Sequence, residues 1–230
     1  MKNNLDTGCN IRREKIMDYS DMIIFIMEIV GTIAFASSGA MTGIQKKMDL
    51  FGVNVLGVTT AVGGGLIRDL ILGLNPPVMF RNPRYALTAV ATSTVLFVFV
   101  YARAGAHTGR HAKMRELLLL IGDTIGLGIF TVVGSHTAIT AGYGENRFLL
   151  VFVGVMTGVG GGMLRDVMAG NLPYILVKHA YAVVSLSGAL VYVLLLPYLG
   201  GLPCMMAGAA VVMLIRFLAA YYHWNLPRIS

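Results

Sequence analysis

Seven apolar segments, each about as long as a membrane span, are the feature of this sequence that most restricts its fold. A bilayer core of about 30 Å needs roughly 20 consecutive apolar residues in a helix. The 230 residues are 56% hydrophobic and only 13% charged, far from the composition of a soluble domain. A membrane β-barrel would alternate apolar and polar residues, and these segments do not. The sequence therefore predicts an all-α, polytopic membrane protein with transmembrane helices at about residues 22–44, 51–72, 84–103, 116–138, 147–170, 179–196 and 202–222.

A seven-residue pattern occurs twice inside these segments and divides the chain into two related parts. Residues 63–69 read GGGLIRD, and residues 160–166, which lie 97 positions later, read GGGMLRD. The same spacing relates Gly73 to Gly170, and such self-similarity is the signature of an internal repeat. We therefore divide the chain into a polar N-terminal tail expected to be disordered (1–21), a first three-helix unit (22–103), a basic linker (104–115), a second three-helix unit (116–196), a seventh helix (202–222) and a C-terminal tail (223–230).

Each unit contains three spanning segments, and this odd number has a topological consequence. The second unit must enter the membrane from the side opposite to the first, so the sequence predicts an inverted repeat. Transport proteins commonly have this design, with their sites at the interface between the repeats near the middle of the bilayer.

Three consecutive glycines within an apolar helix predict a break in the second and fifth helices. A glycine costs about 1 kcal/mol relative to alanine in a helix interior. A break frees carbonyl and N–H groups that must face protein or water rather than lipid, and such groups can bind ions. The alternative is close helix packing, for which small residues also serve. We expect breaks at residues 63–65 and 160–162 because an arginine and an aspartate follow each triplet.

Charged residues inside the apolar segments mark the candidate site. Arg68 and Asp69 are neighbours in sequence, so their side chains leave a helix about 100° apart and should pair poorly with each other. We expect partners in the other copy of the pattern or in the acids Glu28 and Asp123. A salt bridge that locks the fold is the alternative to a wetted path, and a bond back to a helix carbonyl is the alternative for the hydroxyls. The predicted pore lining is Gly63, Gly64, Gly65, Arg68, Asp69, Gly160, Gly161, Gly162, Arg165, Asp166, Glu28, Asp123, Ser37, Ser38, Thr60, Thr131 and Thr157.

The net charge of +7 comes from bases near the ends of the apolar segments, where they anchor and orient helices. Nucleic acid is therefore not an expected partner, whereas membrane lipids are, and we expect Lys46 and Lys47 to face the lipid headgroups. The positive-inside rule places the C-terminus in the cytoplasm. The sequence contains no recognisable motif for a metal, a cofactor or a catalytic group, so neither a cofactor nor an enzymatic activity is expected.

At these residues the chain resembles the prokaryotic members of the trimeric intracellular cation (TRIC) channel family. The resemblance covers about residues 22–222 and rests on the doubled pattern and the turn KKMDLFG at residues 46–52. It also rests on the glycine and proline that come after each copy of the pattern, Gly73 and Pro76 in the first and Gly170 and Pro173 in the second. It implies a homotrimer with one pore inside each protomer, potassium-permeable conduction of monovalent cations, and kinked second and fifth helices that line the pore. Some bacterial relatives are instead described as glycine transporters.

Two transport functions and one structural function are therefore open. We predict a monovalent cation channel in the cell (inner) membrane of a bacterium or archaeon, with a secondary transporter for a small amino acid such as glycine as the alternative. A channel needs a continuous hydrated path, whereas a transporter needs an occluded site with alternating access. A membrane scaffold would need no wetted cavity and would leave the glycines packed.

Overall fold

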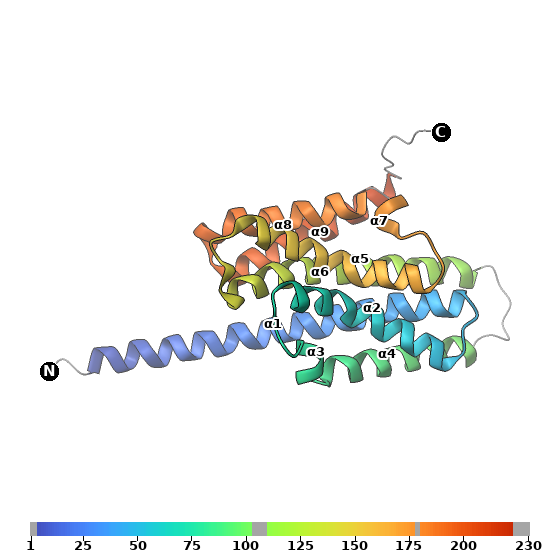
Figure 1. Ribbon diagram of the computed structural model, residues 1–230, viewed down its shortest axis with the longest axis horizontal. Helices are drawn as coiled ribbons and strands as arrows, with labels where there is room; N and C mark the ends of the chain where they lie inside the picture. Colours follow the sequence, from blue (N-terminus) through green and yellow to red (C-terminus); the bar gives the residue numbers. More distant parts are fainter. Residues whose placement is uncertain (1–3, 103–109, 178–179, 223–230) are drawn as a thin grey trace.

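The computed structural model describes residues 4–102, 110–177 and 180–222. In these ranges the chain forms helices and no strand (Figure 1), which confirms the all-α fold. The elements in chain order are α1 (Asn4–Gln45), α2 (Leu50–Ile71), α3 (Val78–Arg81), α4 (Arg84–Ala102), α5 (Arg110–Ala138), the π-helical turn η1 (Ile139–Tyr143), α6 (Arg147–Met168), α7 (Tyr174–Val177), α8 (Ala180–Leu199) and α9 (Gly201–Tyr221).

Seven helical stretches are long and apolar enough to cross a membrane. Each coincides within a few residues with one of the predicted segments, which confirms an integral membrane protein with seven transmembrane helices. The short helices α3 and α7 lie in the connections that follow α2 and α6. The seven spans are Tyr19–Gln45, Leu50–Ile71, Arg84–Ala102, Glu116–Tyr143, Arg147–Met168, Tyr181–Leu199 and Gly201–Tyr221.

The flanks of the spans are more helical than the sequence predicted. The expected disorder of the N-terminal tail is wrong for residues 4–21, because α1 is one helix from Asn4 onward. A helix that is already formed extends by gaining about one hydrogen bond per residue fixed, so a polar flank can continue it beyond the span. Similarly, α5 begins at Arg110, inside the predicted linker. Residues 104–109 of that linker and the C-terminal tail 223–230 lie outside the described residues.

The second helices of the two units begin and end in the same way. α2 and α6 are followed by glycines in the left-handed region, Gly73 at φ 69° and Gly170 at φ 67°, where a residue without a Cβ fits best. At their starts, the side chains of Asp49 and Asn146 accept a hydrogen bond from the backbone N–H three residues on, at 2.7 and 3.0 Å. Both matches are 97 positions apart and support the predicted repeat.

The two units run in opposite directions through the bundle (Figure 1). α1 enters from the end that carries the N-terminus, and α5 enters from the opposite end, where α4 finishes. Within the units the packing is equivalent, because α1 contacts α2 and α4 while α5 contacts α6 and α8. α2 and α6 contact each other where the units meet. This arrangement fits an inverted repeat; a pseudo-twofold axis in the membrane plane stays a prediction.

The predicted breaks at the glycine triplets are wrong, because α2 and α6 each continue through their triplet as a single helix. The triplets instead bring the two backbones into contact. A Cβ on Gly64 would overlap the carbonyl oxygen of Thr157, and a Cβ on Gly161 would overlap the carbonyl oxygen of Thr60. Close packing therefore explains the triplets, since any larger residue would hold the helices apart.

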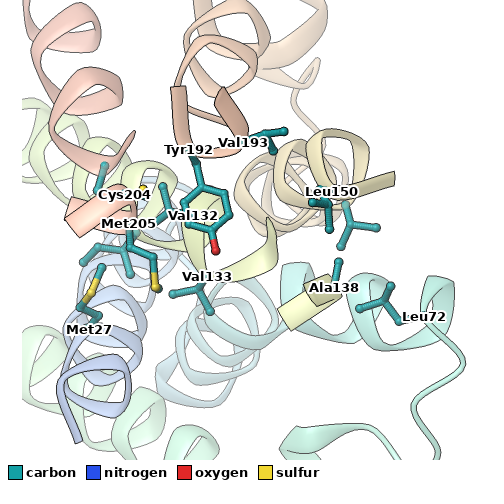
Figure 2. Packing of buried hydrophobic residues seen from close by; sticks show 13 residues of the cluster. Met27, Leu72, Val132, Val133, Ala138, Leu150, Tyr192, Val193, Cys204 and Met205 are labelled. Carbon is teal, nitrogen blue, oxygen red and sulfur yellow. The ribbon is translucent and has the colours of Figure 1, made fainter. Parts of the chain in front are cut away.

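The largest apolar cluster attaches α9 to the second unit. Figure 2 shows Tyr192 of α8 beside Val132 and Val133 of α5, with Met205 of α9 and Met27 of α1 in the same cluster. Van der Waals packing of this kind holds helices together in lipid, where the hydrophobic effect between helices is absent. α9 packs on α5 and α8, so the seventh helix supplements one unit and makes the two units unequal.

We predict opposite effects for alanine at two neighbouring glycines. Gly64→Ala places a Cβ against a backbone carbonyl and should lower the free energy of unfolding by roughly 1–3 kcal/mol. Gly65→Ala is the control, because its Cβ would meet nothing nearer than 3.8 Å, and it should preserve or slightly raise stability since alanine favours helix. Thermal unfolding of the detergent-solubilised variants measures both, and equal losses would contradict the packing interpretation.

Candidate functional site

Each glycine triplet is followed by a buried ion pair. Arg68 Nε lies 2.8 Å from Asp69 Oδ1, and Arg165 Nε lies 2.8 Å from Asp166 Oδ1. The prediction that these sequence neighbours pair poorly is wrong, because the long arginine side chain curls around the helix and spans the roughly 100° between the two directions. All four side chains are at most 6% exposed, so each charge depends on its protein partner.

The second oxygen of each aspartate holds the short helix that follows. Asp69 Oδ2 accepts a hydrogen bond from the backbone N–H of Val78, the first residue of α3, at 2.7 Å. Asp166 Oδ2 accepts one from Tyr174, the first residue of α7, at 2.9 Å. Such charge-assisted bonds are roughly twice as strong as neutral ones. Tyr174 lies outside the spans, and burial raises the pKa of its hydroxyl.

A half-open cavity lies beside the ion pair of the first unit. Glu28 of α1 and Tyr85 of α4 meet there, and the tyrosine hydroxyl donates a hydrogen bond to Glu28 Oε2. The space available to water is about 40 Å³, and one water needs roughly 10–15 Å³ on this measure. The cavity therefore has room for a few waters or a small ion. Its charged and hydroxyl-bearing lining residues are Glu28, Thr32, Arg68, Asp69 and Tyr85.

The corresponding place in the second unit is closed around Asp123, which is fully buried. Its Oδ1 accepts hydrogen bonds from Arg165 Nη1 at 2.7 Å and from the Tyr181 hydroxyl at 3.2 Å. Its Oδ2 faces Arg216 of α9, whose Nη2 is 3.6 Å away. Arg165 also donates to Ser38 of α1 at 2.5 Å. The expected partnership between an arginine of the repeated pattern and a buried acid is thus found in this unit.

The hydroxyls predicted to line a path are bonded mainly to helix carbonyls. Ser37, Thr60 and Thr157 each donate to the carbonyl four residues earlier, at 2.6–2.7 Å. Thr131 does the same and also lies 2.7 Å from the Ser185 hydroxyl. These hydroxyls are satisfied locally, as the alternative interpretation held, so their role in lining a path stays a prediction.

The groups around Glu28 and around Asp123 form two acidic clusters, one in each unit. Sequence reasoning missed three of their members, which are Tyr85, Tyr181 and Arg216. Arg216 is the single charged residue between positions 202 and 222, and an isolated charge in a span is a signal that could have identified it. The tyrosines lie 96 positions apart. They gave no signal because tyrosine near a helix end is common at membrane interfaces.

The clusters carry more acidic than basic groups. The pore lining predicted from the sequence contains four acids and two arginines, and Arg216 raises the number of arginines to three. One negative charge remains uncompensated if every group is ionised. The groups are Glu28, Asp69, Asp123 and Asp166 against Arg68, Arg165 and Arg216.

We predict that Asp166→Asn destabilises the protein strongly. The change leaves Arg165 with one buried partner fewer, and breaking a buried pair costs about 3–5 kcal/mol. Asp49→Asn is the matched control, because Asp49 is exposed and asparagine caps a helix about as well as aspartate. The midpoint of thermal unfolding in detergent compares the two, and an unchanged midpoint for Asp166→Asn would refute a structural role for the pair.

Sequence comparisons match most of the chain to a single protein family. The family model described as Glycine transporter matches residues 25–114 and 120–197, which correspond to the two units in turn. The UPF0126 inner membrane protein YadS of Escherichia coli K12 is 36% identical over 209 residues, covering 90% of this chain and 96% of YadS. A UPF0126 membrane protein of Deinococcus radiodurans is 36% identical over 203 residues, covering 87% and 89% of the two chains.

Solved structures of TRIC channels share the fold. The crystal structure of a prokaryotic TRIC channel in 0.5 M KCl has a TM-score of 0.79 and 32% identity, covering 89% of this chain and 99% of that chain. The TRIC orthologue from Rhodobacter sphaeroides has a TM-score of 0.76 and 30% identity, covering 88% and 99%. The chain therefore belongs to the family of the glycine-transporter model and the UPF0126 membrane proteins, which is the TRIC family indicated by the doubled glycine pattern.

Proposed function

We propose that this protein is a potassium-permeable channel for monovalent cations, with one pore in each protomer of a homotrimer. The observation that carries the proposal is the cavity at Glu28. Among the described residues, no arginine or lysine nitrogen lies within 4.0 Å of this carboxylate. An acid without a basic partner inside a span indicates contact with water or a permeating ion. Two of the related solved structures are cation channels by name, which supports the same function.

The proposed path passes between α2 and α6. In the described state the glycine triplets close it by backbone contact, so conduction requires the two helices to separate there. Separation would uncover the carbonyl oxygens of Thr60 and Thr157, which now lie against Gly161 and Gly64. Backbone carbonyls replace part of the hydration shell in known cation filters. We therefore assign both triplets to the neck of the open pore.

The excess of acids favours cations over anions in this path. Four carboxylates and three arginines lie in the two clusters, and Glu28, the carboxylate with no arginine or lysine nitrogen within 4.0 Å among the described residues, lines the cavity. A local negative charge raises the concentration of cations near it and repels anions. The arginines next to the triplets are neutralised by Asp69 and Asp166, so they do not oppose cation entry.

The proposed assembly is a homotrimer in the cell inner membrane, with the C-terminus in the cytoplasm. The similar Rhodobacter sphaeroides protein is a trimeric channel by name. α4 is the least buried of the seven spans, with only 11% of its apolar stretch buried. It therefore offers apolar surface to a neighbouring protomer or to lipid. Lys46 and Lys47 are exposed in the turn between α1 and α2, where each can gain roughly 1 kcal/mol from anionic headgroups. Cross-linking in native membranes tests the trimer.

Glycine transport is the second candidate, because the cavity offers both charges that a zwitterion needs. Arg68 can face a carboxylate, and Glu28 can face an ammonium group, since both line the same space. The closed Asp123 cluster in the other unit resembles the occluded half of an alternating-access cycle. The family model that matches the chain is also described as a glycine transporter.

We predict that the wild-type protein carries cation-selective unitary currents and that Glu28→Gln lowers the potassium conductance about fivefold or more. The estimate follows from about 1 kcal/mol of attraction to a charge 4 Å away in water. Glu145→Gln is the control, because Glu145 is exposed in the connection before α6 and should leave conductance unchanged. Reversal potentials and currents in planar bilayers with asymmetric potassium chloride measure both variants.

Two outcomes would reject this function. Anion selectivity in the wild type would contradict the charge argument. Glycine uptake into proteoliposomes by a protein that passes no unitary current would establish the transporter instead, because unitary currents far exceed the turnover of any transporter.

A further inference from the structure

The two acidic clusters occupy equivalent places in the two units. Glu28 and Asp123 lie 95 positions apart in the first helix of each unit. Each accepts a hydrogen bond from a tyrosine of the third helix, Tyr85 or Tyr181. The cavity beside Glu28 is half open, whereas the space beside Asp123 is occupied by the guanidinium of Arg216. Asp123 thus has two arginine neighbours, Arg165 at 2.7 Å and Arg216 at 3.6 Å, and Arg216 is the one that has no counterpart in the first unit.

Arg216 comes from the helix that has no counterpart in the first unit. It lies on α9, which packs against α5 and α8, and its side chain is 6% exposed. The guanidinium carbon is 5.0 Å from the centre of the Tyr181 ring, and Nη2 is 3.6 Å from Asp123 Oδ2. The positive charge thus lies between a carboxylate and an aromatic face, two groups that bind cations in general.

The pairing of Arg216 with Asp123 is geometrically poor. A strong arginine–carboxylate pair has two parallel hydrogen bonds of about 2.7–2.9 Å, whereas this contact is a single one of 3.6 Å. Asp123 Oδ2 and Arg216 Nε are both buried without a hydrogen-bond partner among the described residues. Buried polar groups without partners are costly, so the cluster gains if a better ligand takes the place of the guanidinium.

We propose that the Asp123 carboxylate is a second cation-binding site and that Arg216 is a tethered cation which masks it. The ligand is a small monovalent cation, either an alkali-metal ion or the ammonium group of a small amino acid. Arg216 moves away when the ligand enters, and Asp123 Oδ2 becomes a ligand atom. This inference rests on the proposed transport function, because it assigns a second site on the same path.

The placement of the two carboxylates gives the second site a role in transport. Glu28 and Asp123 each lie in the first half of their spanning helix, and these helices run in opposite directions (Figure 1). The two carboxylates therefore lie toward opposite ends of the bundle. A cation that leaves one carboxylate and reaches the other has crossed the closed neck between α2 and α6.

The experiment measures how potassium stabilises the detergent-solubilised protein against thermal unfolding. Potassium chloride replaces choline chloride at constant ionic strength, and the readout is the potassium concentration that gives half of the full shift. Arg216→Gln removes the tethered charge and keeps hydrogen-bonding capacity, so this concentration should fall at least about tenfold. Arg147→Gln removes the same charge from an exposed position and should behave like the wild type.

Further variants test whether the higher potassium affinity of Arg216→Gln depends on Asp123. Asp123→Asn combined with Arg216→Gln should abolish this increase in affinity. Arg216→Lys, which keeps a tethered cation, should resemble the wild type. A glycine titration in choline chloride identifies the ligand: stabilisation by glycine and not by potassium assigns the site to an ammonium group. Arg216→Ala serves as the second variant if Arg216→Gln does not assemble.

Three results would overturn the inference. The first is a midpoint in Arg216→Gln that is unchanged for both potassium and glycine, and the second is an increase in ligand affinity that persists without the Asp123 charge. The third is failure of both neutral variants to assemble, which would make the pair a structural lock. Planar-bilayer currents of the wild type test the proposed function separately. Normal currents together with an unchanged midpoint would remove the second site and leave the channel function standing.

Discussion

Burial of charge in an apolar bundle is the constraint on which the rest of this structure depends. Each aspartate of the repeated pattern divides its two oxygens between the preceding arginine and a backbone N–H of the next short helix. Removing the arginine would leave the charge of a buried carboxylate without its basic partner. The ion pair therefore fixes the end of a spanning helix, the loop after it and the short helix as one piece, and it does so in both units.

The glycine triplets act through distance rather than through local flexibility. They let α2 and α6 approach until the backbone of one helix lies against Thr60 or Thr157 of the other. Two side chains of the facing helix also take part in this contact, Leu164 against Gly63 and Ile67 against Gly160. The same contact that closes the interface thus also holds carbonyl oxygens ready for an ion when the helices part.

The sequence predicted the seven spans and the charged residues buried within them, because length, apolarity and isolated charges are properties of short stretches. The division into two units stays a prediction that the packing of the helices supports. Sequence reasoning failed where tertiary contact decides the outcome. Glycine weakens an isolated helix, yet packing between α2 and α6 keeps both helices continuous. The pairing of Arg68 with Asp69 depends on how a long side chain bends. Arg216 was missed because α9 lies outside the repeat, so no second copy drew attention to it.

The unpaired seventh helix also explains how two related sites can differ in one conformation. In an exact inverted repeat, the two carboxylates would have the same surroundings, and no conformation with one site open and the other closed would be favoured by the sites themselves. Arg216 supplies a positive charge to Asp123 and none to Glu28. A ligand shifts a conformational equilibrium only by its difference in affinity between the states. A tethered cation at one carboxylate adds to the difference already made by the Arg165–Asp123 pair, since an incoming cation competes with Arg216 at Asp123 and with no arginine that close at Glu28.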